Sequence, residues 1–501
     1  MANSRKLGVL LSYGGNLLLV AVNIFLTPFL VSKLGDAEYG VYQMMASFAG
    51  YLVLMNFGTG TVMTRYVSVY LGKKDKEGER NFIAMGLIIS GVLMALIAVV
   101  SSVMYIFLED IYSTSLNAQQ IEKAKLLFAV VSVNVMVTLI TQAFRGIVVA
   151  YEKFSVTNGY NILKILLKAG LIVLLFSIRV DSLVIVCVDL FLEILHFIVC
   201  FTYSQFVLKA TPKLIKFDKA VFVSAALFAF AMMLQTVVNL VNTRVDITIL
   251  GIMIGPHSVT VYSVAVQLFT VFSSVSTAAI SVFLPKFSKL VAEGMADGDS
   301  LTREMIAPSR LQTLLSGTIL FGVLACGRDF IKVWVGDGYS DAWIIALIIM
   351  VPTFLVYSNS VVESVLDALQ KRLVRSVVLF LVALANIVLS IVLVHFFGEL
   401  GAPIGTAVAT MVGSLIIMNI YYSKAIGIRV MFLFKESFKG IIPALILAYL
   451  ITLPVSVLVP VSFWGLLIKG TMFVLILVIM LILFGLNKSE KKMIKSLFER
   501  K

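Results

Sequence analysis

Uninterrupted apolar runs of about 20 residues or more dominate this sequence, and that is the length a helix needs to cross the hydrocarbon core of a bilayer. Of the 501 residues, 60% are hydrophobic and 13% are charged, and the mean hydropathy is +1.03. Soluble domains carry about a quarter charged residues. A long apolar run satisfies its backbone groups within one helix, whereas the strands of a membrane barrel alternate over about ten residues. The sequence therefore predicts an all-α polytopic membrane protein.

Charged residues, glycines and prolines delimit fourteen expected spans. These spans lie near residues 7–31, 40–63, 81–108, 125–149, 156–178, 182–207, 220–253, 258–284, 306–327, 342–366, 373–397, 402–423, 438–459 and 463–486. The seventh run, at about 34 residues, would measure about 51 Å and is too long for a straight crossing, so it must bend, tilt or protrude.

The positive charges predict the orientation of the chain, because Lys and Arg in short loops are retained on the cytoplasmic side. With the N-terminus inside, the inner segments hold thirty of the 40 Lys and Arg residues and the outer segments hold six. The remaining four, Lys164, Lys168, Arg244 and Lys469, lie within spans. Both termini are expected to be cytoplasmic, and the net charge of +13 needs no nucleic acid to explain it.

A weak internal repeat predicts two related halves. LGDAEYGVY at 34–42 matches IGPHSVTVY at 254–262 with an offset of 220, and GIVVAYEKF from Gly146 matches VLDALQKRL from Val365 with an offset of 219. Two such lobes would have parallel topology and enclose a substrate path. The expected divisions are a first lobe of six spans (1–215), a second pseudo-symmetric lobe of six spans (216–430), two added spans (431–487) and a basic tail (488–501).

Ionisable residues inside spans are costly, so each is a functional hypothesis. Lys164 and Lys168 share one helix face, and Asp189, Glu193 and His196 share a face of the next span. A rise of 1.5 Å per residue puts Lys168 and Asp189 about 12 and 10 Å from the outer side, and Lys164 and Glu193 about 18 and 16 Å from it. Two salt bridges that staple adjacent helices, an anion site and a proton relay are all compatible with these depths.

The seventh span carries a second intramembrane group. Arg244 and Asp246 lie there among Asn and Thr residues, which is typical of a helix that faces water, although a helix end outside the hydrocarbon is the alternative. Asp189, Glu193 and Asp246 are the candidate titrating groups for ion coupling. The last intramembrane cation, Lys469 in the fourteenth span, is expected to snorkel toward the interface.

A third group lies at the inner ends of the spans. Arg65 and Arg145 belong to the first half, and Glu363 and Asp367 to the second. Opposite signs on opposite halves suggest a cytoplasmic gate that closes by pairing and parts when the cavity opens inward. Simple topology anchors are the alternative for the two arginines.

The sequence contains no Walker loop, zinc-ligand spacing or nucleophile elbow, so neither an enzyme, an ATP-driven pump, a cofactor nor a bound metal is expected. A glycan polymerase would be expected to carry a large external loop, whereas the longest outer segment here, near 109–122, has about 14 residues.

Three segments carry a family resemblance: LGDAEYGVY after the first span, FRGIVVAYEKF from Phe144, and NTRVDITILGIMIGPHSVTVYSVA from Asn242. With the fourteen spans, they resemble the Wzx-type oligosaccharide flippases of the multidrug and oligosaccharidyl-lipid export superfamily. The resemblance implies a MATE-like fold, alternating access and ion-gradient coupling. The implied substrate is an undecaprenyl-pyrophosphate-linked repeat unit of O-antigen, capsule or a related glycan, with polymerase and assembly proteins as possible partners in the cytoplasmic membrane. The cations expected to bind its pyrophosphate are Arg65, Arg145, Lys164, Lys168 and Arg244.

Two sister families remain as alternatives. Drug and cation antiporters usually carry an acidic residue in the first span, and residues 7–31 have none. Lipid II flippases place arginines in spans 1, 2 and 8, whereas the eighth expected span here, residues 258–284, carries no charge. The lipid II flippase is the second choice.

Overall fold

The computed structural model describes residues 2–278, 280–293, 297–369, 372–487 and 490–491. Every regular element in these ranges is a helix, so the expected all-helical class is confirmed. The chain divides into two compact units, Met1–Thr260 and Val261–Lys501. The lobes expected at 1–215 and 216–430 stay a prediction, since the first compact unit also takes in the helices between residues 219 and 253.

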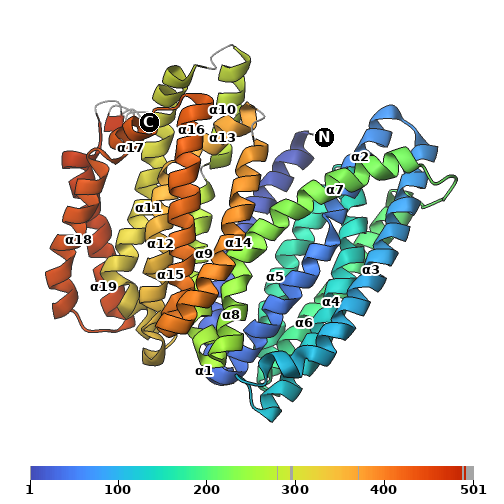
Figure 1. The fold of residues 1–501 in the computed structure, drawn as a ribbon, viewed down its shortest axis with the longest axis horizontal. Helices are drawn as coiled ribbons and strands as arrows, with labels where there is room; N and C mark the ends of the chain where they lie inside the picture. Colours follow the sequence, from blue (N-terminus) through green and yellow to red (C-terminus); the bar gives the residue numbers. More distant parts are fainter. Residues whose placement is uncertain (1, 279, 294–296, 370–371, 488–489, 492–501) are drawn as a thin grey trace. The chain divides into compact units, whose positions relative to one another are not determined.

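The first unit begins with six long helices, followed by a broken one. They are α1 (Ala2–Val53), α2 (Thr59–Lys73), α3 (Lys76–Tyr112), α4 (Ala118–Ala150), α5 (Phe154–Phe176), α6 (Ser182–Thr202), α7 (Lys219–Leu240) and α8 (Asp246–Met253). Short 3-10 and π-helical turns are η1 (Leu54–Asn56), η2 (Tyr203–Val207) and η3 (Val241–Val245). Helices α3, α4 and α6 run side by side, and α7 passes α2 (Figure 1).

The second unit holds the remaining helices. They are α9 (Pro256–Ala278, beginning in the first unit), α10 (Ile280–Ala292), α11 (Gly298–Trp334), α12 (Ala342–Ser358), α13 (Val361–Ala368), α14 (Arg372–Phe397), α15 (Gly401–Ala409), α16 (Met418–Ile426), α17 (Val430–Phe438), α18 (Ile441–Leu458) and α19 (Phe463–Met480). Its short turns are η4 (Asp337–Tyr339), η5 (Gly398–Leu400), η6 (Thr410–Ile417) and η7 (Leu481–Gly485). Helices α18 and α19 pack together along one edge of this unit (Figure 1).

Within the described residues, ten helices are long and apolar enough to cross a membrane, or eleven if the bent pair Val430–Phe438 and Ile441–Val455 counts as one span. The expected number was fourteen. Part of the difference arises because Leu17–Lys73 and Val374–Ile426 each cover two expected spans. Only short irregularities separate the two halves of each segment, at Gly35 in the first and at Gly398–Leu400 in the second.

Gly35 marks the connection between the first two expected spans. Its φ of 74° and ψ of 172° break the helical geometry of α1, although helix continues on both sides. A residue with a Cβ adopts this left-handed region only at a cost, so glycine suits the kink. The connection is thus a sharp bend rather than a loop.

Polar caps define where the spans begin. Asp75 accepts a hydrogen bond from the Gly78 N–H at 2.8 Å and starts α3, whose first turn carries two glutamates. Asn117 and Gln120 form a reciprocal capping box at the start of α4, with hydrogen bonds of 2.9 and 3.0 Å. These caps satisfy N–H groups that a helix leaves unpaired, and they keep the helix ends in register with the polar boundary.

The link between η2 and α7 is tied to the start of α3. Asn81 accepts hydrogen bonds from the N–H groups of Ile215 (2.8 Å) and Lys216 (3.0 Å) and donates one to the Lys216 carbonyl (2.8 Å). The Lys213 N–H also donates to the Arg80 carbonyl at 3.1 Å. One asparagine therefore fixes the segment that leads into α7.

Candidate substrate site

A ladder of polar contacts joins α5 and α6 in the first unit. Lys168 pairs with Asp189 at 2.7 Å, and one helical turn away Lys164 pairs with Glu193. Both pairings follow the depths predicted from helix rise, so the two expected salt bridges are confirmed. The role of these residues in binding or coupling stays a prediction.

The two carboxylates differ in exposure. The Glu193 side chain is 5% exposed and that of Asp189 is 23% exposed, while their lysine partners are 28% and 31% exposed. A carboxylate buried within spanning helices is stable only with a cation and hydrogen bonds. The partly exposed lysines can still reach a further anion.

A third contact between α5 and α6, one turn beyond the two ion pairs, was not predicted; each of these three levels is called a rung of the ladder. The ring of His196 stacks on that of Tyr160, with centroids 4.5 Å apart and planes at 10°. The Tyr160 hydroxyl donates to the Leu192 carbonyl at 2.5 Å, and Nδ1 of His196 lies 3.5 Å from the Glu193 carboxylate. The sequence did contain a sign of this contact, because Tyr160 continues the four-residue spacing of the two lysines along α5 and therefore shares their helix face.

Tyrosines of α1 lie beside this ladder. Tyr42 interacts electrostatically with Lys168, Asp189 and Arg244, and Tyr39 with Arg244. Arg244 belongs to the π-helical turn η3, and its side chain packs where Gly50 leaves room on α1. Two of the five predicted head-group cations, Lys168 and Arg244, thus interact with tyrosines of α1, and Lys164 lies one helical turn from Lys168.

The stretch after Arg244 is also polar and tied to α1. Asp246 opens α8 and is 3% exposed, and it interacts electrostatically with Tyr51. The Tyr51 hydroxyl donates to the Thr248 hydroxyl at 2.9 Å. The long seventh span, which was expected to bend, tilt or protrude, contains the π-helical turn η3, a feature frequent at functional sites.

The two other predicted cations lie elsewhere in the first unit. Arg65 is exposed on α2, with its guanidinium carbon 4.3 Å from the ring centroid of Phe228. Arg145 on α4 donates to the Gln142 side chain at 3.1 Å, and its Nε has no hydrogen-bond partner in the described part of the chain. No described contact joins either arginine to the lysine ladder.

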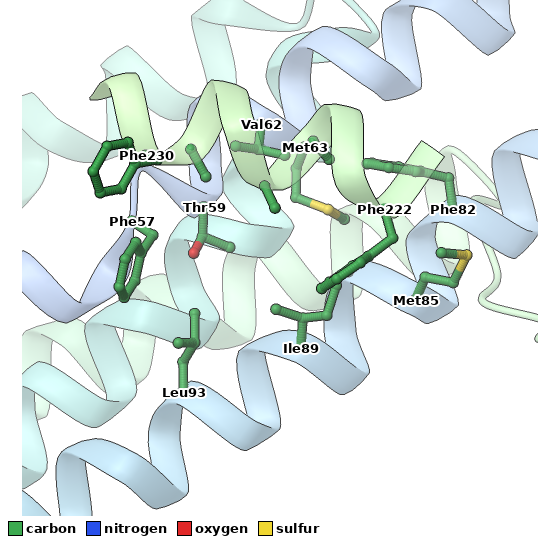
Figure 2. Close-up of a pocket in the computed structure, with 14 residues that line it drawn as sticks. Phe57, Thr59, Val62, Met63, Phe82, Met85, Ile89, Leu93, Phe222 and Phe230 are labelled. Carbon is green, nitrogen blue, oxygen red and sulfur yellow. The ribbon is translucent and has the colours of Figure 1, made fainter. Parts of the chain in front are cut away.

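An apolar pocket of about 280 Å³ lies on the α2 to α7 side of this unit. Its lining includes aromatic and methionine side chains and the hydroxyl of Thr59 (Figure 2): Phe57, Phe82, Phe222, Phe230, Met63 and Met85. Hydrocarbon is the only chemistry that such walls suit.

The predicted gate residues lie in the second unit. Glu363 on α13 pairs with Arg375 on α14 at 2.5 Å. Asp367 belongs to α13 as well, but its side chain lies outside the described residues. The gate between halves stays a prediction.

The expectation that Lys469 snorkels was wrong. Its side chain is 1% exposed and its ammonium lies 2.5 Å from the carboxylate of Asp329 on α11. Snorkelling needs a path to the interface, whereas this side chain is enclosed by α11 and α18 and neutralised within the unit.

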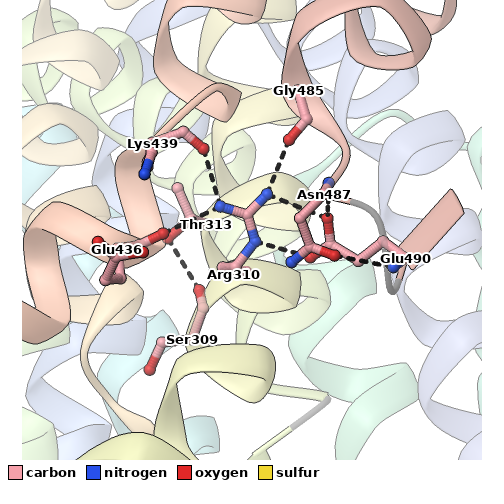
Figure 3. A network of polar contacts seen from close by, with 8 residues as sticks. All are labelled: Ser309, Arg310, Thr313, Glu436, Lys439, Gly485, Asn487 and Glu490. Atoms are coloured by element: carbon pink, nitrogen blue, oxygen red, sulfur yellow. Dashed lines mark hydrogen bonds and ion pairs between the residues drawn. The ribbon is translucent and has the colours of Figure 1, made fainter.

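Arg310 forms a second buried polar centre, which was counted only as a topology marker. Its guanidinium donates to the carbonyls of Glu436 (2.9 Å), Lys439 (2.8 Å) and Gly485 (2.7 Å) and to the carboxylate of Glu490 (2.7 and 3.0 Å). The carbonyls belong to the ends of α17 and η7, where a helix leaves acceptors unpaired (Figure 3). One buried arginine thereby caps two helix ends and holds the start of the tail.

The sequence model of a protein family described as "Polysaccharide biosynthesis protein" matches residues 8–291. The chain is also 20% identical over 468 residues to the "Uncharacterized membrane protein EpsK" of Bacillus subtilis (strain 168), with 89% of this chain and 88% of that protein covered.

Solved structures share the fold. A lipid II flippase, MurJ, in an inward closed conformation has a TM-score of 0.70 at 16% identity, covering 95% of this chain and 98% of that chain. An inward-facing multidrug resistance MATE family transporter of the MOP superfamily has a TM-score of 0.63 at 14% identity, covering 83% of this chain and 96% of that chain. These likenesses show a common architecture.

Proposed function

Because this chain belongs to the polysaccharide biosynthesis protein family, we propose that it is a membrane transporter that flips undecaprenyl-pyrophosphate-linked oligosaccharide repeat units across the cytoplasmic membrane. O-antigen and capsule units are the substrate classes in view. The chain crosses the membrane fourteen times with both termini in the cytoplasm, works by ion-coupled alternating access, and is not an enzyme.

The observation that carries this proposal is a group of cations and tyrosines in the first unit, formed by Lys164, Lys168, Arg244, Tyr39 and Tyr42. Lys164 and Lys168 are partly exposed beside the buried Glu193 and the partly exposed Asp189, and Lys168 and Arg244 both interact electrostatically with Tyr42. A pyrophosphate head needs several cations within a polar region of the bilayer, and sugars pack on aromatic rings. Spanning helices that face only lipid would not retain such groups.

The alternatives lack comparable support. A drug or cation antiporter needs acids that attract a cation, and each described carboxylate of the ladder already has a lysine. A lipid II flippase also carries an undecaprenyl pyrophosphate, and its fold is shared. The uncharged stretch from Ser258 to Leu284 argues against that substrate.

Transport into proteoliposomes tests the proposal. Full-length protein is reconstituted with a fluorescent undecaprenyl-pyrophosphate oligosaccharide or with fluorescent lipid II, and a membrane-impermeant quencher reports the flipped fraction. The wild type is expected to flip the oligosaccharide at least about tenfold faster than lipid II, about 1.4 kcal/mol of selectivity. The opposite preference would favour the lipid II flippase, and equal inactivity on both would reject the proposal.

A neutral double variant separates binding from scaffolding. Lys164→Gln with Glu193→Gln removes the ammonium without leaving a lone buried charge. Transport is expected to fall at least about tenfold although the protein folds, because a head-group cation is lost. The matched control replaces the exposed Lys125 and Glu109 pair by Gln in the same way and is expected to transport normally. Normal transport by the first variant would show that the pair is only structural.

A further inference from the structure

His196 is a buried histidine whose two ring nitrogens have different surroundings. The residue is 4% exposed, and its ring is held flat against Tyr160. Nδ1 faces the Glu193 carboxylate at 3.5 Å, whereas Nε2 is buried and has no hydrogen-bond partner among the described residues. An orphaned polar atom in the interior costs free energy and is rarely retained without a use.

The neighbours assign the protons. Glu193 accepts from Lys164 and is therefore ionised, so Nδ1 of His196 carries the hydrogen that points toward it. In the neutral imidazole this leaves the lone pair on Nε2. Among the described residues of this rung, Nε2 of His196 is thus a buried nitrogen that offers a lone pair and receives no hydrogen bond.

The surrounding groups leave the rung with no net charge. Lys164 and Tyr160 face it from α5, and Glu193 and Cys200 belong to α6 itself. From α4, Arg145 acts on Cys200. From α1, Tyr42 interacts electrostatically with Lys168 and Asp189 of the neighbouring pair. One ammonium and one carboxylate balance, so an added proton makes the rung a net cation.

We infer that the coupling proton of the proposed transporter binds Nε2 of His196, and that the resulting imidazolium competes with Lys164 for the Glu193 carboxylate. The inference rests on the proposed function and names its ion site. A hydronium ion of the water gives up its proton, so one O–H bond breaks and one N–H bond forms at Nε2; no bond between heavy atoms changes, and Glu193 stays ionised throughout. Lys164, already 28% exposed, is thereby released to bind a diphosphate head group.

This arrangement couples the two ligands reciprocally. Protonation raises the charge of the rung by one and loosens one ammonium, so it strengthens anion binding. Linkage then requires a bound anion to strengthen proton binding by the same factor. The proton and the head group are therefore held together, and loss of the proton on one side of the membrane weakens the hold on the anion.

The chain itself supplies matched controls, because it contains three histidines. His257 is exposed beside Asp36, and His395 is exposed near the end of α14. The binding of farnesyl pyrophosphate to purified full-length protein is measured between about pH 5.5 and 8, where histidines titrate. The proteins compared are the wild type, H196Q, H257Q and H395Q. The pyrophosphate of the probe titrates identically in all four measurements. Differences in the pH dependence of binding among the four proteins therefore arise from the protein.

The expected result is specific to one variant. From about pH 8 to about pH 6, the affinity of the wild type relative to H196Q rises about fivefold or more, a usual size for such coupling. H257Q and H395Q are expected to follow the wild type. An H196Q profile parallel to that of the wild type would overturn the inference and leave the proposed function intact. Failure of the wild type to bind the probe at every pH would overturn both.

A second measurement, the ¹⁵N chemical shift of the histidines in the wild-type protein, tests the inference even if H196Q folds poorly. In wild-type protein labelled with ¹⁵N-histidine, one Nε2 resonance is expected to change from the shift of a bare nitrogen to that of an N–H as the pH falls. Added farnesyl pyrophosphate should increase the protonated fraction of that resonance at a fixed pH. A buried histidine whose Nε2 shift does not respond to pH or to the probe would refute the assignment.

Discussion

Thr260 donates a hydrogen bond from its hydroxyl to the main-chain oxygen of Asp36 across 2.8 Å. Nearby, a Cβ on Gly40 would collide with the main-chain carbonyl of Pro256. At the repeat offset of 220, Asp36 corresponds to Pro256 and Gly40 to Thr260. Residue 36 therefore contacts the repeat counterpart of residue 40, and residue 40 contacts the counterpart of residue 36. Two copies of a turn make such contacts when they pack about a local two-fold axis. This reciprocal contact supports the proposed duplication.

Gly40→Ala is expected to destabilise the protein by about 1–3 kcal/mol, because the new methyl group must displace a backbone carbonyl. Gly14, in the same helix, has no heavy atom within 4 Å of the equivalent position. Gly14→Ala is thus a matched control, expected to be neutral or to gain up to about 1 kcal/mol from helix propensity. Thermal unfolding in detergent measures both, and equal melting temperatures would contradict the close contact.

Breaking the Lys164–Glu193 rung on one side is expected to be worse than removing it altogether. Glu193→Gln leaves Lys164 and His196 facing each other without an anion, whereas the double Gln variant leaves no formal charge in the pair. A double-mutant cycle should give a coupling of about 1–3 kcal/mol. The exposed Lys125–Glu109 pair should couple by less than about 1 kcal/mol. Similar couplings for the two pairs would mean that the ladder adds no stability beyond a surface ion pair.

The ladder was predictable because its geometry is local. The two lysine-carboxylate pairs join consecutive antiparallel helices, so helix rise alone matched Lys164 with Glu193 and Lys168 with Asp189. The stacking of Tyr160 on His196 follows the same register but was missed, since an aromatic residue among apolar neighbours carries no charge to mark it.

Other contacts depend on packing between distant segments. Lys469 meets Asp329 across 140 positions of sequence, and hydropathy around Lys469 gives no sign of its partner. The number of separate long helices in the described residues differs from fourteen for a related reason: hydropathy finds apolar runs but does not show whether the link at Gly35 or at Gly398 stays nearly helical. Such features are set by tertiary contacts rather than by local pattern.

The buried Lys469–Asp329 pair gives a third prediction. Lys469→Met alone leaves a carboxylate without its cation and is expected to cost about 3 kcal/mol. Adding Asp329→Leu removes the stranded charge, so the double variant should recover most of the wild-type stability. Chemical denaturation of the two variants tests this, and a double variant less stable than the single one would show that the pair is more than a neutralised charge.

Arg310→Lys is expected to destabilise the second unit by about 2–4 kcal/mol, although it keeps the positive charge. A lysine has no planar fork, so the carbonyls of Lys439 and Gly485 and the Glu490 carboxylate cannot all be satisfied. The control is Arg429→Lys, which alters an exposed pair with Asp299 and should cost less than about 1 kcal/mol. Thermal unfolding of both variants tests this prediction. Equal melting temperatures of Arg310→Lys and Arg429→Lys would show that the Arg310 network is dispensable.

The same network predicts an acid-sensitive C-terminal attachment. Burial opposes ionisation of Glu490, but hydrogen bonds from Arg310 and from the Asn487 N–H outweigh it and hold the pKa of Glu490 below its ordinary 4.5. The stabilisation is therefore complete above about pH 4.5 and is lost as the pH falls through the lowered value. Measured by melting temperature, the advantage of the wild type over Glu490→Gln should shrink from about pH 6 to about pH 3. A constant difference would show that the carboxylate charge is not involved.

The seventh span is attached to neighbouring helices at both of its ends. The chain entering α7 is anchored to α3 by Asn81, and beyond η3 the helix α8 packs against α1. The π-helical turn Val241–Val245 lies between these two attachments and interrupts the regular α-helical geometry. Arg244 belongs to that turn and interacts electrostatically with Tyr39 and Tyr42 of α1, so a change in the geometry of the turn would change the position of a positive charge relative to these tyrosines.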